Sequence, residues 1–134
     1  MTKNYYYLIE EYLCGESLYA RIERTGSLQT GELIRLGIEL CRIMNYLHSF
    51  KPNPILYLDL HPGNLLICRE QLKLIDFDQA ALASLSQERS VCYGTKGFAA
   101  PEQYEGGTLD ERTDIYAIGA LLYYMGTGHA PEGR

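Results

Sequence analysis

The chain has 134 residues, a length that fits one domain with a real hydrophobic core. Its composition is ordinary for a folded protein, with 46% hydrophobic and 22% charged residues and no low-complexity tract. The net charge of -5 and the scattered lysines argue against a nucleic-acid-binding protein, because phosphate contacts need clustered Lys and Arg.

Cysteine usage and hydropathy indicate a cytoplasmic protein. The chain has four widely separated cysteines: Cys14, Cys41, Cys68 and Cys92. They form no C-x-x-C pair and have no His at zinc-ligand spacing, so free thiols in a reducing cytoplasm are favoured over a disulfide pairing, which stays open. Residues 1–4 lead into tyrosines and not into the apolar stretch of a signal peptide. The longest apolar stretch, 115–125, is too short to span a bilayer, so no membrane partner is expected.

The first half of the chain predicts a strand and two helices. Residues 5–12 are rich in aromatic and branched side chains, which is typical of a strand. Ser17 can cap a short helix that ends toward Gly26, and Thr30 can cap a longer one. The longer helix has apolar residues at spacings of three and four: Leu33, Leu36, Leu40, Ile43 and Leu47. The two prolines in 51–54 end it.

The second half predicts a hairpin, a long irregular segment and a final helix. Two short apolar runs, 65–68 and 72–75, flank three polar residues and suggest a small hairpin. Residues 78–100 show no sustained period, and so long a loop in a compact domain is usually functional or a misassignment. Residues 110–125 predict a strongly apolar helix that is closed by two glycines.

Three oxygen-bearing side chains lie in loops beside the predicted hairpin. Asp59 and Asn64 are five residues apart before it, and Asp76 follows it. Mg²⁺ takes oxygen ligands, usually one or two from the protein together with phosphates. The remaining carboxylate is then free to accept a proton from a nucleophile. Asp59 by itself is a weak signal, because Asp and Asn in loops more often form turns.

Further motifs strengthen the signal by their order and spacing. G-T-K-G-F-A-A-P-E stands at 94–102 and D-I-Y-A-I-G at 114–119, while E-Y-L-C-G-E-S-L stands at 11–18. With these motifs the chain resembles a protein kinase of the bacterial Ser/Thr type. The resemblance implies an α+β, mainly α fold: a kinase-like C-lobe with a small hairpin at 17–134, preceded at 1–16 by the last N-lobe strand and the hinge.

The resemblance implies a catalytic and a metal-binding set. Asp59 matches the catalytic-loop Asp that orients the substrate hydroxyl and accepts its proton, and Thr95 matches a threonine that contacts this Asp. His61 stands at the position that contacts the transferred phosphoryl group. Asn64 and Asp76 match the two positions that hold Mg²⁺, and the implied nucleotide is ATP.

Other residues match positions around adenine and in the scaffold. Glu11 and Leu13 match hinge positions whose backbone groups hydrogen-bond adenine, and Leu66 matches the residue beneath that ring. Asp114 resembles a buried helix carboxylate that hydrogen-bonds the catalytic-loop backbone. Glu102 resembles a carboxylate that pairs with an Arg in a later helix, and such a helix is not part of this sequence.

The sequence departs from the kinase pattern at four positions. Leu58 replaces an Arg that gathers a phosphate on the activation loop, which argues against that mode of control. His61 replaces a Lys, and a neutral imidazole stabilises less negative charge on the phosphoryl group. Asp78 replaces a Gly, and Glu10 stands where a residue gates the pocket behind adenine. The serines of the activation loop are expected to be solvated loop residues: Ser84, Ser86 and Ser90.

Two functions remain open from the sequence. One is phosphoryl transfer from Mg-ATP to a protein Ser/Thr hydroxyl in the intact domain; the other is a catalytically inactive, pseudokinase-like interaction module. The Gly-rich loop, strand Lys and helix Glu of kinases have no counterpart in these residues, so we expect the isolated chain to be inactive. Residues 59–64 also resemble small-molecule phosphotransferases, but 94–102 and 114–119 argue against that class. We expect self-association through the apolar helix surface at 115–125.

Overall fold

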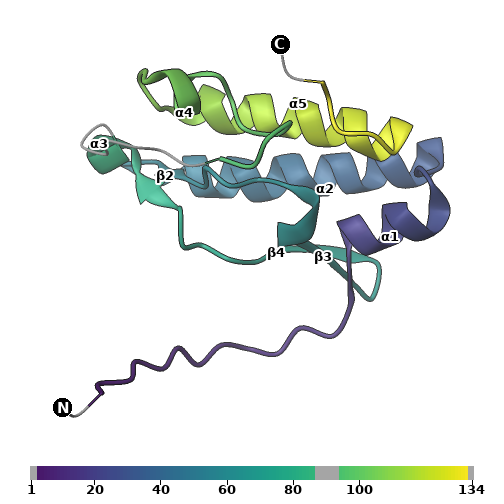
Figure 1. Cartoon of the computed structure of the whole chain (residues 1–134), viewed down its shortest axis with the longest axis horizontal. Coiled ribbons are helices and arrows are strands. Elements are labelled where there is room, and N and C mark those ends of the chain that lie inside the picture. Colours follow the sequence, from purple (N-terminus) through teal and green to yellow (C-terminus); the bar gives the residue numbers. More distant parts are fainter. Residues whose placement is uncertain (1–2, 87–93, 133–134) are drawn as a thin grey trace.

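The computed structural model describes residues 3–86 and 94–132 (Figure 1). The helices are α1 (Leu18–Thr25), α2 (Thr30–His48), the 3-10 helix η1 (Pro62–Asn64), α3 (Ala83–Ser86), α4 (Glu102–Glu105) and α5 (Glu111–Thr127). The strands are β1 (Glu16–Ser17), β2 (Ile55–Leu56), β3 (Leu65–Cys68), β4 (Gln71–Leu74) and β5 (Ala81–Leu82). Mixed helices and small sheets confirm the predicted α+β fold.

Helices α1 and α2 begin and end close to where the sequence predicts. The Ser17 hydroxyl accepts a hydrogen bond from the Ala20 N–H at 3.0 Å, and Gly26 ends α1 with a φ of 80°. Thr30 is the first residue of α2. The capping position is held by Gln29, which has an extended backbone and makes no side-chain cap bond. The prediction of Thr30 as the cap is therefore wrong by one residue.

Helix α5 has a complete capping box at its start. The Asp110 carboxylate accepts from the Arg112 N–H at 2.9 Å, and the Thr113 hydroxyl accepts from the Asp110 N–H at 3.3 Å. The helix ends at Thr127, and Gly128 follows with a left-handed φ of 77°. Gly126 lies inside the helix, so only the second of the two predicted glycines closes it.

The core lies between α2 and α5, which run side by side in Figure 1, with α1 and the β3–β4 hairpin beside them. Leu36, Leu40 and Met44 of α2 and Leu121 and Met125 of α5 are at most 1% exposed. A smaller cluster packs beneath the loop that follows β2: Leu56, Leu58 and Leu109. The two helices form a rigid base for the loops that carry the polar motifs.

The small sheets confirm the predicted hairpin and add short pairings that were not predicted. Strands β3 and β4 pair antiparallel with Leu65 opposite Leu74, and β1 adds to the other side of β3. Strands β2 and β5 form a separate pair, with Ile55 opposite Leu82. Of this second pair, β5 lies within residues 78–100, the region for which the sequence showed no period, and β2 lies before the hairpin.

The predicted strand at residues 5–12 is wrong. The segment forms no strand and runs away from the body of the molecule in Figure 1. Tyr6 and Ile9 are each 93% exposed. A strand requires a hydrogen-bonded neighbour, and no strand among the described residues lies beside this segment.

The expectations for serines and cysteines have mixed outcomes. Ser84 and Ser86 both lie in α3 and not in a loop; Ser84 is exposed as expected, whereas Ser86 is only 2% exposed. Three cysteines are free thiols: Cys14, Cys41 and Cys68. Ser90 and Cys92 lie outside the described residues. In the described part of the chain, every helix is too short or too polar to cross a membrane.

Candidate active site

The loop that carries Asp59 is anchored on a buried carboxylate of α5. Asp114 is 1% exposed and accepts hydrogen bonds from the N–H groups of Tyr57 and Leu58, each at 2.9 Å. The His48 Nε2 atom of α2 lies 2.8 Å from the same carboxylate. The structure thus shows the bond between Asp114 and the loop backbone that the resemblance implied.

Asp59 is held by two neighbouring side chains. The Thr95 hydroxyl donates to Asp59 Oδ1 at 3.1 Å. The Asn64 amide donates to the Asp59 backbone oxygen at 3.1 Å and to Asp59 Oδ2 at 3.3 Å. The carboxylate keeps 20% of its surface exposed, so it is both oriented and accessible to a substrate. This is the arrangement that a general base for a hydroxyl nucleophile requires.

His61 faces Asp59 in a defined tautomer. Its Nδ1 atom accepts a hydrogen bond from the Gly63 N–H at 3.1 Å, so a neutral ring carries its proton on Nε2. Nε2 lies 3.8 Å from Asp59 Oδ2, which is too long for a hydrogen bond.

Tyr57 connects the loop of Asp59 with the segment that carries Asp76. The Tyr57 side chain is fully buried, and its hydroxyl donates to the backbone oxygen of Ile75. Burial, followed by the negative charges of Asp59 and Asp76, raises the pKa of the Tyr57 hydroxyl. The Asn64 side chain also hydrogen-bonds this group. The buried Tyr57 hydroxyl thus interacts with all three side chains that the sequence singled out, Asp59, Asn64 and Asp76.

Asp76 adopts a backbone conformation that is unusual for its residue type. Its φ is 60°, in the left-handed region, and its Oδ1 atom accepts from the Asp78 N–H at 3.2 Å. The next residue, Phe77, packs edge-on against Tyr57 with ring centroids 5.3 Å apart. Asp78 itself does not have a positive φ. The backbone here therefore does not require the glycine that kinases have at this position.

A cleft of about 820 Å³ brings the predicted adenine-binding residues together. Glu11, Leu13 and Leu66 of β3 line it, together with Asp76, which lies two residues after the end of β4. The remaining lining residues are Leu8, Glu10, Tyr12, Leu74, Ile75, Phe77 and Asp78. Asp59, His61 and Thr95 do not line this cleft. Of the two residues predicted to hold magnesium, Asp76 lines the cleft and Asn64 does not.

The residues predicted to hold magnesium fit a hard cation that phosphates share. Within residues 3–86 and 94–132 no group of three or more His, Cys, Asp or Glu side chains is placed to hold a metal ion. Asn64 and Asp76 supply one amide and one carboxylate, which suits Mg²⁺ because it keeps water and phosphate oxygens as its other ligands. The bonds between Asn64 and Asp59 use the amide nitrogen of Asn64 and not its amide oxygen, which is the atom that a cation would require.

Gln103 is a buried residue of the site that the sequence did not reveal. Leu58 has a φ of 66°, which is rare for a leucine, and its backbone is held on both sides. Asp114 accepts from its N–H, while the Gln103 amide donates to its carbonyl at 2.8 Å. Gln103 also accepts from the Ala100 N–H at 3.1 Å, so it links the loop of Asp59 to the segment after Thr95. No sequence pattern marks a lone Gln in a short helix.

Glu102 has a different partner from the one implied by the resemblance. Its Oε1 atom accepts a hydrogen bond from the Thr113 hydroxyl at 2.8 Å. Thr113 belongs to the capping box of α5 and is 1% exposed. Among the described residues, Glu102 therefore ties α4 to the start of α5.

Comparison with known proteins gives the family to which these loops and this fold belong. Residues 1–133 match the family described as "Protein kinase domain". The chain belongs to the protein kinase family.

Similar proteins include kinases from bacteria, plants and animals. The chain is 32% identical over 130 residues to serine/threonine-protein kinase PknB of Mycobacterium leprae, which covers 93% of the chain and 20% of that protein. It is 32% identical over 129 residues to integrin-linked protein kinase 1 of Arabidopsis thaliana (90% and 27%). It is 35% identical over 132 residues to sperm motility kinase 3A of Mus musculus (97% and 26%). The chain thus spans only about a fifth to a quarter of these relatives.

Proposed function

We propose that these residues serve phosphoryl transfer from Mg-ATP to a Ser or Thr hydroxyl of a protein, within an intact kinase domain. The observation that carries the proposal is the Asp59 carboxylate, oriented by both Thr95 and Asn64 while it stays partly exposed. Phosphoryl transfer needs alignment and charge neutralisation more than covalent help, and a carboxylate held in this way supplies alignment.

In this proposal Asp59 orients the incoming hydroxyl and accepts its proton. A bond forms between the hydroxyl oxygen and the γ-phosphorus, the bond from that phosphorus to the bridging oxygen breaks, and ADP leaves. Asn64 and Asp76 would hold magnesium, which neutralises phosphate charge when bound. The backbone of Glu11 and Leu13 would face adenine across the cleft, with Leu66 beneath the ring.

The alternative is a catalytically inactive interaction module. It is favoured by His61, an imidazole at the position where the kinase pattern has a Lys, 3.8 Å from Asp59 Oδ2. A neutral imidazole gives less stabilisation to developing negative charge than a cation does. The cytoplasm remains the proposed location, which suits the free thiols of Cys14, Cys41 and Cys68.

A fusion protein distinguishes the two functions. The chain would be joined behind the small lobe of PknB from Mycobacterium leprae, which supplies a nucleotide clamp, and incubated with Mg-ATP and a generic Ser/Thr substrate. We expect transfer that Asp59→Asn reduces at least about a hundredfold, the lower range for a general base. A fusion that binds ATP but transfers nothing would support the inactive module instead.

A further inference from the structure

Helix α4 holds the residue that precedes Asp59. The Gln103 amide donates to the carbonyl of Leu58 at 2.8 Å, while its oxygen accepts from the Ala100 N–H at 3.1 Å. Gln103 is 5% exposed, so little water competes for these bonds. Leu58 has a φ of 66°, and a conformation that leucine rarely adopts persists only where its surroundings hold it. Gln103 therefore helps to fix the direction in which the chain enters Asp59.

The next residue of α4 holds the residue that precedes Thr95. The Tyr104 hydroxyl donates to the carbonyl of Gly94 at 2.9 Å. Thr95 opens a tight turn, because its own carbonyl accepts from the N–H groups of Phe98 and Ala99 at 3.0 and 2.9 Å. The turn thus holds Thr95 from its C-terminal side, and Tyr104 holds it from its N-terminal side.

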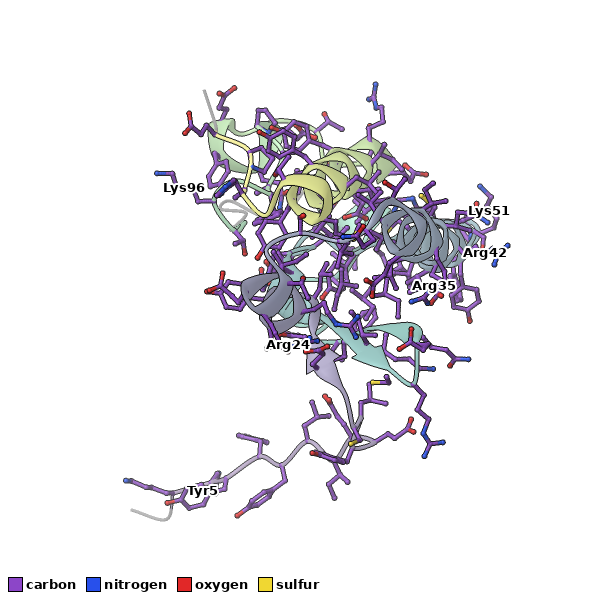
Figure 2. The ribbon with its side chains drawn as sticks, turned by 90° about the vertical axis from the view of Figure 1, so that its right-hand side faces the viewer. Tyr5, Arg24, Arg35, Arg42, Lys51 and Lys96 are labelled. Atoms are coloured by element: carbon purple, nitrogen blue, oxygen red, sulfur yellow. The ribbon has the colours of Figure 1, made fainter. Side chains whose placement is uncertain are left out.

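The side chain of Thr95 faces inward from this turn. Lys96, the next residue, is exposed, and Figure 2 places it at the opposite edge of the molecule from Arg42 of α2. The Thr95 hydroxyl instead donates to Asp59 Oδ1 at 3.1 Å, across 36 positions of the sequence. Both partners are partly exposed, so water competes for this bond, and the bond alone does not hold the two segments together. The contact therefore depends on how the backbone on each side of it is held.

We propose that Gln103 and Tyr104 are positioning residues, here called the α4 clamp. By holding the residue before each partner, the clamp keeps the Thr95 hydroxyl against the Asp59 carboxylate. The inference rests on the proposed phosphoryl transfer, in which that carboxylate orients the acceptor hydroxyl. A misplacement of an aligning group lowers the rate even when its cause lies away from the reacting atoms.

The carboxyl ¹³C resonance of Asp59 tests the clamp in the labelled full chain without any reaction. Thr95→Val removes the hydroxyl and calibrates the shift that marks the loss of its bond to Asp59. Tyr104→Phe removes one hydroxyl from a residue that is 56% exposed, so the fold should remain. We expect Tyr104→Phe, and Gln103→Met, which removes the amide donor, to move the resonance in the direction set by Thr95→Val.

A matched control keeps this measurement decisive. Tyr46→Phe removes a hydroxyl from a residue of α2 that is 64% exposed, and it should leave the Asp59 resonance in place. Circular dichroism should show that each variant retains its helices. An unmoved resonance in the folded Tyr104→Phe chain, or an equal movement in Tyr46→Phe, would overturn the proposal.

A double-mutant cycle in the fusion protein tests whether the clamp acts through this contact. Tyr104→Phe should lower kcat about fivefold with the KM for ATP unchanged, which is the effect of one hydrogen bond. On the Thr95→Val background the same change should cost less than about twofold, because the contact is already lost. Equal costs on the two backgrounds would overturn the proposal, since a loss of folded protein acts equally on both. A fusion that transfers nothing would refute the proposed function, and the Asp59 resonance would then decide the clamp by itself.

Discussion

Asp114→Asn perturbs the anchor that positions Asp59. The carboxylate of Asp114 accepts from two buried backbone N–H groups, those of Tyr57 and Leu58, and contacts His48. An Asn at this position offers one oxygen and turns its amide N–H toward the second donor. One charge-assisted hydrogen bond is lost and a buried donor is left unpaired, a cost of about 3 kcal/mol.

This cost is measurable by thermal and urea unfolding followed by circular dichroism. A chain of this size has an unfolding entropy of about 0.3 kcal/mol/K, so Tm should fall by about 10 °C. Glu105→Gln is the matched control, because Glu105 is an exposed carboxylate of α4 and its loss should change stability by no more than about 0.5 kcal/mol. If Asp114→Asn were no more destabilising than this control, the anchoring role of Asp114 would be refuted.

Three further predictions concern the site. The 134-residue chain alone should transfer no phosphoryl group from Mg-ATP to a generic Ser/Thr substrate, since it contains no counterpart of the Gly-rich loop or strand Lys. Phosphoryl transfer that Asp59→Asn abolishes would contradict this. The pKa of Tyr57 in the folded state lies above the unfolded value of 10.0. Its contribution to the free energy of unfolding is therefore complete below pH 10 and is lost as pH rises toward the folded pKa. Tyr57→Phe should therefore flatten the alkaline loss of stability in urea titrations, and unchanged slopes would count against it. His61→Lys should raise transfer by the fusion protein about tenfold by placing a cation near the phosphoryl group, whereas an unchanged rate would remove His61 from the transfer step.

The sequence predicted those elements whose signals are local. Helix α1 has a capping serine and a closing glycine, and α5 has a continuous apolar run followed by glycines, so their bounds were close to those observed. The β3–β4 hairpin is also local, since its turn of Arg69 and Glu70 joins two adjacent apolar runs. Such signals require no knowledge of what lies across the molecule.

Elements that depend on distant partners were missed or wrong. Residues 5–12 have strand propensity, but propensity does not supply a neighbour, and the segment is unpaired. The β2–β5 pair joins Ile55 to Leu82 across 27 positions and is only two residues long. Neither partner carries a pattern long enough to be recognised.

In the candidate site, too, residues in local motifs were predicted, and residues whose role depends on distant partners were missed. Asp59, Asn64 and Thr95 stand in motifs, and the structure brings them into contact. Gln103 and His48 support the same loop, yet each is a single polar residue in a helix without a motif. Their importance follows from burial and from the backbone groups they meet, which the packing of α2, α4 and α5 determines.

Paramagnetic broadening by Mn²⁺ tests most directly the proposal that Asn64 and Asp76 hold a divalent cation beside Asp59. Mn²⁺ takes the same oxygen ligands as Mg²⁺ and broadens nearby amide resonances even at low occupancy. With Mn²⁺ and ADP added to the labelled chain, the signals of Asn64 and Asp76 should broaden first, and Asp76→Ala should remove this selectivity. Broadening spread evenly over surface carboxylates such as Glu105 and Glu132, with Asn64 unaffected, would contradict the account.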